Sequence, residues 1–246
     1  MSTLLVPYHL DESMSELPQR AGRVITAEMP PGEFWSRIAP LHGVVADAVA
    51  DADRPAVIAG DCTVALGVVA GLRRRGVVPA VVWFDAHGDL HTPQSSASNY
   101  PGGMPLRRVL DQGVGPVWLV GARDLDPPEA EFLAATDSVQ RAEIGELTVP
   151  DGPIYLHIDL DVLDPAEVPG FRFPAERGPS AKEIRQAARR VLDTGRVVAM
   201  TLVCSWQPGH GASRAAGPLV DELLDYYGTA GRPPGSTGSP ADRHAR

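Results

Sequence analysis

Short apolar segments alternate with amphipathic segments along most of the chain. The apolar segments are rich in valine and isoleucine and show little polar alternation, which is typical of strands covered on both faces of a sheet. They predict strands at 3–7, 55–59, 79–84, 116–120, 153–158 and 197–203. The segments between them predict helices at 34–50, 63–75, 127–135, 181–193 and 218–227.

Two of the predicted helices carry boundary signals. Ser180 and Glu183 form an S-x-x-E capping box, and Gly195 follows the end of that helix. The last helix is expected to begin at Pro218 and to stop at Gly228. Because strands and helices alternate, the pattern predicts an α/β fold with three α/β/α layers and a mostly parallel sheet.

The 246 residues fit one domain, which we expect to span residues 1–228. Residues 229–246 are rich in proline, glycine, serine and charged residues, and this composition predicts a disordered tail. Glycine and proline are abundant just after the predicted strands, where open α/β sheets bind their ligands. Function is therefore expected in these loops.

The net charge of −9 argues against nucleic acids and anionic membranes as partners. No apolar run approaches the roughly 18 residues of a membrane span, and the N-terminus lacks the features of a secretion signal. Cys62 and Cys204 are the two cysteines, so one disulfide is the upper limit. We therefore expect a reduced, cytoplasmic protein.

Metal-ligand side chains gather after three of the predicted strands. These segments are Gly60-Asp61-Cys62, Asp85-Ala86-His87-Gly88-Asp89, and Asp159-Leu160-Asp161. In an extended segment, residues two apart point the same way, so Asp85, His87 and Asp89 can converge. Such a concentration of buried carboxylates requires cations to neutralise it.

A single D-x-D is weak evidence, because aspartate is common in the turns that follow strands. D-x-H-x-D after one strand together with D-x-D after another is far more specific. A site rich in carboxylates suits Mn²⁺ or Mg²⁺ better than Zn²⁺. Five or six ligands exceed what one ion needs and favour a two-metal site.

The blocks AGDC, FDAHGD, GARDLDPPE and HIDLDVLDP resemble, in this order, the signature blocks of the ureohydrolases, the family of arginase and agmatinase. The resemblance covers roughly residues 55–170. It implies an arginase-like fold and two Mn²⁺ ions that serve the hydrolysis of guanidino or amidino C–N bonds. Carried over by position, Asp85 and Asp159 bridge the metals. Each metal then has two further ligands, namely Cys62 with Asp89 and His87 with Asp161.

The resemblance also implies roles in catalysis. Guanidinium carbon is a poor electrophile, so its hydrolysis needs a strong nucleophile, which a two-metal site generates from water. Asp89 would orient that nucleophile, and a proton must reach the leaving amine. Arginases use a histidine downstream of the D-x-H-x-D block for this proton, but Gly102 occupies its position here. His91 is the substitute candidate, with a loop histidine that contacts solvent or the substrate tail as the alternative.

Cys62 stands where the family usually has a metal-binding histidine. A thiolate is softer than imidazole and would shift the metal preference toward Zn²⁺ or Fe²⁺. The alternative is a buried, inert thiol beside a one-metal site. Cys204 occupies the position at which arginases hold the guanidinium with a glutamate, and this puts unmodified arginine in doubt as the substrate.

Two further candidates for substrate binding come from the same resemblance. Asp126 matches the residue that binds the substrate's amino group, although it could instead cap the helix that starts at Pro127. Ser98 lies where arginases place a hydroxyl against the substrate carboxylate.

The combined motifs resemble the N-hydroxyarginine hydrolase branch, which predicts a metal-dependent hydrolase of specialised metabolism with a small guanidino or amidino substrate. Alternatives are a peptide-level arginase, an agmatinase-type deprotecting amidinohydrolase, and a degenerate member that only binds a ligand. A nucleotide-binding module is disfavoured, because the chain has no G-x-G-x-x-G or Walker motif. Relatives form homo-oligomers, but no interface signature is visible here.

Overall fold

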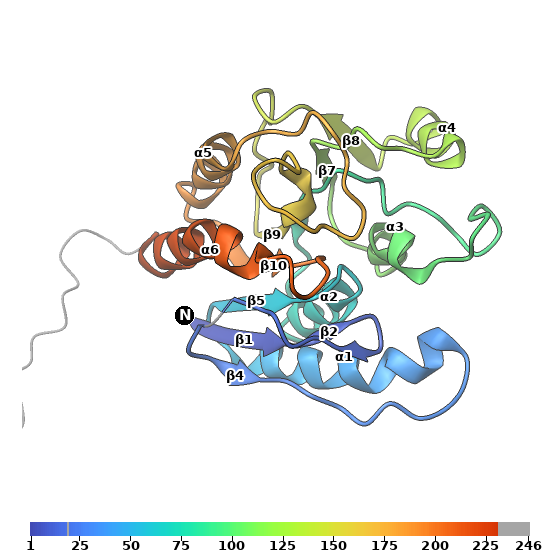
Figure 1. The fold of residues 1–246 in the computed structure, drawn as a ribbon, viewed down its shortest axis with the longest axis vertical. Coiled ribbons are helices and arrows are strands. Elements are labelled where there is room, and N and C mark those ends of the chain that lie inside the picture. The colour runs from blue at the N-terminus through green and yellow to red at the C-terminus, as the bar shows by residue number, and fades with distance from the viewer. Residues whose placement is uncertain (19, 231–246) are drawn as a thin grey trace, which may run out of the picture.

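The computed structural model describes residues 1–18 and 20–230. Its centre is an eight-stranded sheet in the order β4-β1-β5-β10-β9-β6-β7-β8, with parallel pairing throughout (Figure 1). The strands are β1 Ser2–Val6, β4 Arg23–Val24, β5 Pro55–Ala59, β6 Ala80–Phe84, β7 Val117–Val120, β8 Val139–Ala142, β9 Ile154–Asp159 and β10 Val197–Val203. A separate antiparallel hairpin joins β2 Tyr8–His9 to β3 Glu12–Ser13.

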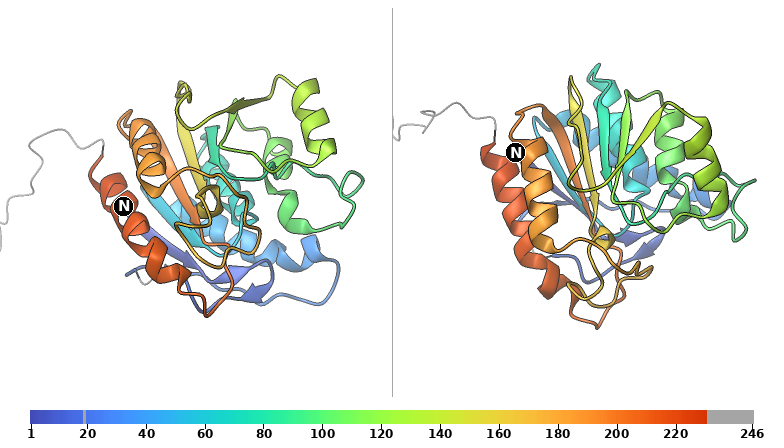
Figure 2. Two further views of the ribbon diagram at one scale, coloured as in Figure 1. Left: turned by 45° about the horizontal axis from the view of Figure 1, so that its top comes forward. Right: turned by 90° about the horizontal axis from the view of Figure 1, so that it is seen from above.

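Helices cover both faces of the sheet, as Figure 2 shows. They are α1 Phe34–Asp51, α2 Val64–Arg74, α3 Pro105–Asp111, α4 Pro127–Ala135, α5 Ala181–Leu192 and α6 Ala212–Thr229. One apolar core lies between the sheet and α5 with α6, and the other lies between the sheet and α1, α2 and α3. The predicted three-layer α/β/α fold is confirmed.

The six predicted strands are present within one residue at each end. The sequence analysis missed β2, β3, β4 and β8, which have only two to four residues each. Strands this short, with exposed polar positions as in β8, give no hydrophobic periodicity to detect. The predicted capping box of α5 is present, with the Ser180 side chain accepting a hydrogen bond from the Glu183 amide.

One helix was missed, and another begins earlier than predicted. Helix α3 was not predicted, because it follows a loop rich in proline and glycine. Helix α6 begins at Ala212 rather than at Pro218, after Gly211 with a φ of +80°. Pro218 and Arg214 are both exposed, so water can satisfy the Arg214 carbonyl that loses its helical donor. Thr229 ends α6 instead of beginning the predicted tail, and residues 231–246 lie outside the described residues.

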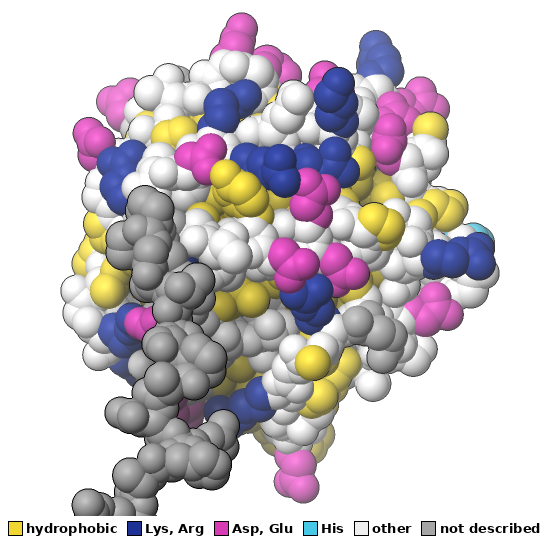
Figure 3. All heavy atoms as spheres, turned by 90° about the vertical axis from the view of Figure 1, so that its left-hand side faces the viewer, with side chains coloured by type: hydrophobic (Ala, Val, Ile, Leu, Met, Phe, Trp, Pro, Cys, Tyr) yellow, Lys and Arg dark blue, Asp and Glu magenta, His cyan; other side chains and the backbone are white. Residues whose placement is uncertain are grey.

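The surface shown in Figure 3 carries interspersed acidic and basic side chains on the side of α5 and α6. Arg185 and Arg189 of α5 both pair with Glu222 of α6 across these helices. Within the described part of the chain, no helix combines the length and the apolar character needed to cross a bilayer.

Candidate metal centre and active site

The predicted metal-binding segments meet at one edge of the sheet. Because the strands are parallel, the residues that follow β5, β6, β7, β9 and β10 all emerge at their carboxyl ends. They surround a cavity of about 430 Å³, a size suited to a small ligand. Its lining includes Cys62, Asp85, His87, Asp89, His91, Ser98, Asp126, Asp159 and Asp161.

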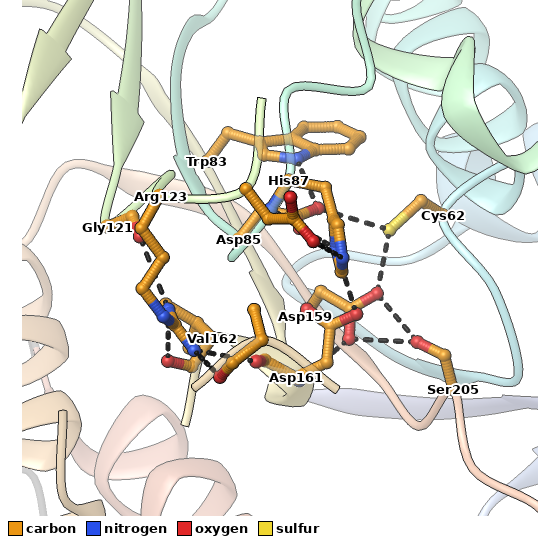
Figure 4. Close-up of polar contacts among 12 residues, drawn as sticks. Cys62, Trp83, Asp85, His87, Gly121, Arg123, Asp159, Asp161, Val162 and Ser205 are labelled. Atoms are coloured by element: carbon orange, nitrogen blue, oxygen red, sulfur yellow. Dashed lines mark hydrogen bonds and ion pairs between the residues drawn. The ribbon is translucent and has the colours of Figure 1, made fainter. Parts of the chain in front are cut away.

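The ligand-type side chains form two groups that share Asp85. The oxygen and sulfur atoms of Cys62, Asp85 and Asp89 lie within 4.8 Å of one another, and so do atoms of Asp85, His87 and Asp161. Asp159 adjoins the first group, with its Oδ2 3.1 Å from the Cys62 Sγ. Figure 4 shows the side chains of Cys62, Asp85, His87, Asp159 and Asp161 pointing toward a common centre. Two neighbouring cation sites with a shared carboxylate fit this arrangement.

Both acidic motifs are shaped by the same local turn. The Oδ1 of Asp85 accepts a hydrogen bond from the His87 amide at 2.8 Å, and the Oδ1 of Asp159 accepts one from the Asp161 amide at 3.0 Å. Asp89 adopts a left-handed φ of 54°. The side chains therefore converge through turns after the strands, and not through the extended alternation assumed for the D-x-H-x-D segment.

Two buried carboxylate oxygens in this cluster have no hydrogen-bond partner among the described residues, namely Oδ2 of Asp89 and Oδ1 of Asp161. Burial, reinforced by the charge of Asp85, raises the pKa of Asp89 well above its usual value and that of Asp161 to about 6. Burial and the charge of Asp161 likewise raise the pKa of Asp159. Carboxylates held this way fit divalent cations, which supply the missing partners.

His87 bridges two carboxylates from different strands. Its Nδ1 lies 3.3 Å from Oδ1 of Asp85 and 3.3 Å from Oδ2 of Asp161. Burial alone would lower the pKa of His87, but the contacts with Asp161 and Asp85 outweigh it and raise the pKa to about 12. Burial opposes ionisation of Asp85, yet the contacts with His87 bring its pKa below the usual value.

Cys62 lies at the centre of the buried cluster. Its Sγ is 3.2 Å from Nε2 of His157 as well as 3.1 Å from Asp159. Burial, followed by the charge of Asp159, raises the pKa of the thiol. A free thiol would therefore stay protonated here, whereas a bound cation would favour the thiolate.

The structure does not bring Cys204 into the cavity. Its side chain is fully buried in the apolar core beside α6, and burial raises its pKa. The predicted substrate contact is therefore not supported by its position. The neighbouring Ser205 faces the site instead, donating its hydroxyl to the Asp159 carboxylate at 2.8–2.9 Å.

His91, Asp126 and Glu129 form a third polar group on the cavity wall. His91 Nε2 lies 2.9 Å from Oδ2 of Asp126, and its Nδ1 lies 3.2 Å from the Ser95 hydroxyl. Glu129 is buried and accepts hydrogen bonds from the amides of Leu90 and Asp126. Asp126 thus begins α4 and also contacts His91, so both of its proposed roles remain compatible with the geometry.

The loop that follows His91 in the sequence lines one side of the cavity. Ser98 is exposed at the rim, where its hydroxyl accepts a hydrogen bond from the Tyr100 amide at 3.3 Å. The Tyr100 hydroxyl lies 3.3 Å from Nε2 of His9. A Cβ on Gly102 would come within 2.4 Å of the Tyr100 ring. Tyr100 therefore occupies the space that a side chain at position 102 would need.

Two arginines lie near the site, one lining the cavity and one bound to backbone carbonyls. Arg172 is the one lysine or arginine among the described residues that line the cavity, and its Nε is buried without a hydrogen-bond partner there. Arg123 lies beneath the site and donates to backbone carbonyls of residues 121, 161–163, 175 and 176 (Figure 4). Arg123 thus holds the D-x-D turn against the segment that carries Arg172.

Sequence reasoning missed several residues of the site. The cavity is also lined by residues from the β2–β3 hairpin and from loops distant in sequence, with no spacing pattern to reveal them, namely His9, Tyr100, Arg172 and Ser205. Asp61 lies in the first ligand-rich segment, but its carboxylate accepts hydrogen bonds from the amides of Leu10 and Thr63. It therefore fixes the β2–β3 hairpin against the end of β5.

Comparison with known proteins finds the Arginase family model matching residues 19–224. The arginase of Bacillus subtilis (strain 168) is 31% identical over 179 residues, covering 61% of this chain and 60% of the relative. The arginase of Bacillus caldovelox is 30% identical over 170 residues, with 56% of each chain covered. The chain thus spans about 60% or less of the length of these relatives.

Solved structures share the fold. A crystal structure of arginase from Bacillus subtilis matches with a TM-score of 0.74 and 23% identity, covering 92% of this chain and 98% of that one. Proclavaminate amidino hydrolase from Streptomyces clavuligerus gives 0.73 and 18%, with 94% and 93% covered. Entamoeba histolytica arginase in complex with L-ornithine gives 0.71 and 18%, with 93% and 98% covered.

Proposed function

The chain belongs to the arginase family, and we propose that it hydrolyses a C–N bond of a small guanidino or amidino substrate with two divalent metal ions. The observation that carries the proposal is the pair of ligand groups that share Asp85 at the cavity floor. The buried, unpartnered oxygens of Asp89 and Asp161 support cation binding at this place.

The two metals would have the following ligands. Cys62 and Asp89 would hold one, His87 and Asp161 would hold the other, and Asp85 and Asp159 would contribute to both. Carboxylates dominate this set and favour Mn²⁺, whereas the Cys62 sulfur increases the affinity for Zn²⁺ or Fe²⁺. When bound, two divalent ions supply a water-derived nucleophile at neutral pH and stabilise developing negative charge.

The chain's own residues then orient the reaction and move protons. Asp89 would accept a hydrogen bond from the attacking water through the carboxylate oxygen that does not bind the metal. His91, held between Ser95 and Asp126, gives a proton to the leaving amine as the C–N bond breaks. Ser205 keeps the Asp159 carboxylate in place.

We propose a weakly basic substrate, for which N-hydroxyarginine of specialised metabolism is the model. Residues 204–206 at the end of β10 are Cys, Ser and Trp, so this strand offers no carboxylate to a guanidinium cation. Asp126, which precedes α4 on the cavity wall, is already paired with His91. A neutral N-hydroxyguanidine needs no carboxylate partner, whereas a buried unpaired guanidinium is costly.

We expect kcat/KM for N-hydroxyarginine to exceed that for L-arginine by about tenfold or more, equivalent to ~1.4 kcal/mol in transition-state binding. Release of hydroxyurea and urea by the Mn²⁺-loaded protein measures the two rates. Equal or faster turnover of arginine would contradict the substrate proposal. Metal binding without release of any urea would instead favour the degenerate, ligand-binding alternative.

Arg172 favours an amino-acid substrate over a decarboxylated amine. It is a cation in a cavity otherwise lined by many carboxylates, and its Nε has no partner among the described residues. A substrate carboxylate would bind the part of the guanidinium that lines the cavity, in a charge-assisted hydrogen bond. The carboxylate of the L-ornithine in the Entamoeba histolytica complex is consistent with such a substrate class.

Arg172→Gln is therefore expected to raise KM for the amino-acid substrate about tenfold with little change in kcat. The KM or inhibition constant of agmatine, which lacks the carboxylate, should stay the same. Arg177→Gln, an exposed change in the same segment, is the matched control. A parallel loss of affinity for agmatine would show that Arg172 does not recognise the carboxylate.

A further inference from the structure

A chain of three buried side chains leads from the sheet interior to the Cys62 sulfur. The Thr201 hydroxyl lies 2.8 Å from the Tyr155 hydroxyl, which lies 3.0 Å from Nδ1 of His157. Nε2 of His157 then lies 3.2 Å from the Cys62 Sγ. Apart from Cys62, each of these side chains is fully buried on β9 or β10. The side chains contact one another directly, so no water is needed to connect them.

The sheet holds the His157 ring rigidly. His157 is the register partner of Trp83 on β6 and of Thr201 on β10. Its ring stacks on the Trp83 indole with centroids 3.5 Å apart and planes 9° apart. The same indole donates its N–H to Oδ2 of Asp85 at 3.0 Å. Trp83 therefore fixes both the histidine that faces Cys62 and a carboxylate of the metal centre.

The donors and acceptors of this chain match a metal-bound sulfur. A cysteine that binds a metal is a thiolate and can only accept hydrogen bonds. A neutral imidazole has one N–H, and with that proton on Nε2 it donates to Sγ. Nδ1 then accepts the Tyr155 hydroxyl proton, and the Tyr155 oxygen accepts the Thr201 hydroxyl proton. Each contact in the chain is satisfied in this direction.

We propose that His157, fixed by Tyr155 and Thr201, is a positioning residue that donates a hydrogen bond to the metal-bound sulfur of Cys62. The inference rests on the proposed metal site. An N–H donor withdraws electron density from the thiolate, making the sulfur a harder ligand that is more compatible with Mn²⁺. Cys62 and His157 therefore act as a pair.

Tyr155→Phe tests the chain with little change in volume. Losing the hydroxyl removes the hydrogen bond that fixes the ring through Nδ1, so the Nε2 donor is held less firmly toward the sulfur and its hydrogen bond to the thiolate weakens. We expect Mn²⁺ affinity to fall by about tenfold or more, the size of effect typical for outer partners of metal ligands. In the Co²⁺-loaded protein, the sulfur-to-cobalt charge-transfer absorption should move to lower energy, because the sulfur becomes more electron-rich.

The Cys62→His background provides the matched control. There the histidine has no sulfur to contact, so adding Tyr155→Phe should leave Mn²⁺ affinity unchanged. Thermal unfolding and circular dichroism of all four proteins establish that each is folded. An equal loss of affinity in both backgrounds, or an unshifted absorption in folded Tyr155→Phe, would overturn the proposal.

These measurements do not depend on turnover. A cobalt–sulfur band that shifts in Tyr155→Phe, in a protein that hydrolyses no guanidino compound, would support the pairing and reject the proposed function. Absence of any cobalt–sulfur band in the unmodified protein would overturn the pairing, even if hydrolysis occurs.

Discussion

Replacing Asp159 with asparagine is expected to remove most of the bound metal and all detectable turnover. The carboxylate lies 3.1 Å from the Cys62 sulfur and receives the Ser205 hydroxyl on both oxygens. Asparagine keeps the size of the side chain but loses the negative charge that a bridging ligand supplies. Metal analysis after gel filtration and a urea-release assay measure the two losses.

Asp151→Asn is the control for this experiment. Asp151 lies just before β9, is exposed, and pairs with Arg196 at the surface. This variant should keep its metal and its activity, because a surface ion pair contributes little. Two metal ions per chain in Asp159→Asn would contradict the proposed bridging role of Asp159.

The metal-depleted protein is expected to lose stability as pH rises. Burial, aided by the charge of Asp85, raises the pKa of Asp161 in the folded state to about 6. The proton on Asp161 therefore stabilises the folded state fully below about pH 4, the usual aspartate pKa. This stabilisation is lost between about pH 4 and 6. That loss amounts to about 3 kcal/mol in the free energy of unfolding.

His87 also makes the metal-depleted protein less stable as pH rises, but over a higher range of pH. Its contacts with Asp161 and Asp85 prevail over burial and raise its pKa to about 12, so its contribution is present below about pH 6.5 and falls above it. Asp85 opposes this trend, because its contacts with His87 lower its pKa and its contribution is lost toward acid. Metal binding replaces the protons, so the increase in Tm on adding Mn²⁺ should grow with pH.

Thermal unfolding at about pH 4, 5, 6.5 and 8, after treatment with a chelator and with Mn²⁺ restored, measures this effect. Asp161→Asn should flatten the pH dependence of the chelator-treated protein below about pH 6.5. A Tm of the chelator-treated protein that rises steadily from about pH 4 to 7 would contradict the assignment of these carboxylates.

The central strands could be predicted because burial on both faces leaves an uninterrupted apolar run, as in β5 and β10. The convergence of Asp85 and Asp159 follows from parallel strands that end at one edge. Cys204 shows the limit of reasoning by position, since at a strand end a shift of one residue exchanges core for cavity. Whether a side chain faces the core or the site depends on local backbone geometry, which the sequence alone leaves open.

Other parts of the site depend on contacts between distant segments. Arg172 reaches the cavity because its amide bonds to the Ser205 carbonyl, a pairing with no local pattern. His157 contacts Cys62, which lies 95 residues away in the sequence. Its stacking on Trp83 depends on which strands are neighbours, and strand order is not encoded in any single segment.

The packing of Gly102 against Tyr100 limits how this site could evolve or be redesigned. A histidine at position 102 alone would collide with the tyrosine ring, so that single mutation displaces Tyr100 before it can offer any benefit. Replacing Tyr100 first opens the space but breaks the contact with His9. The two positions are therefore coupled: a side chain at position 102 requires the Tyr100 ring to move, so we expect Gly102→His and a truncation of Tyr100 to combine non-additively.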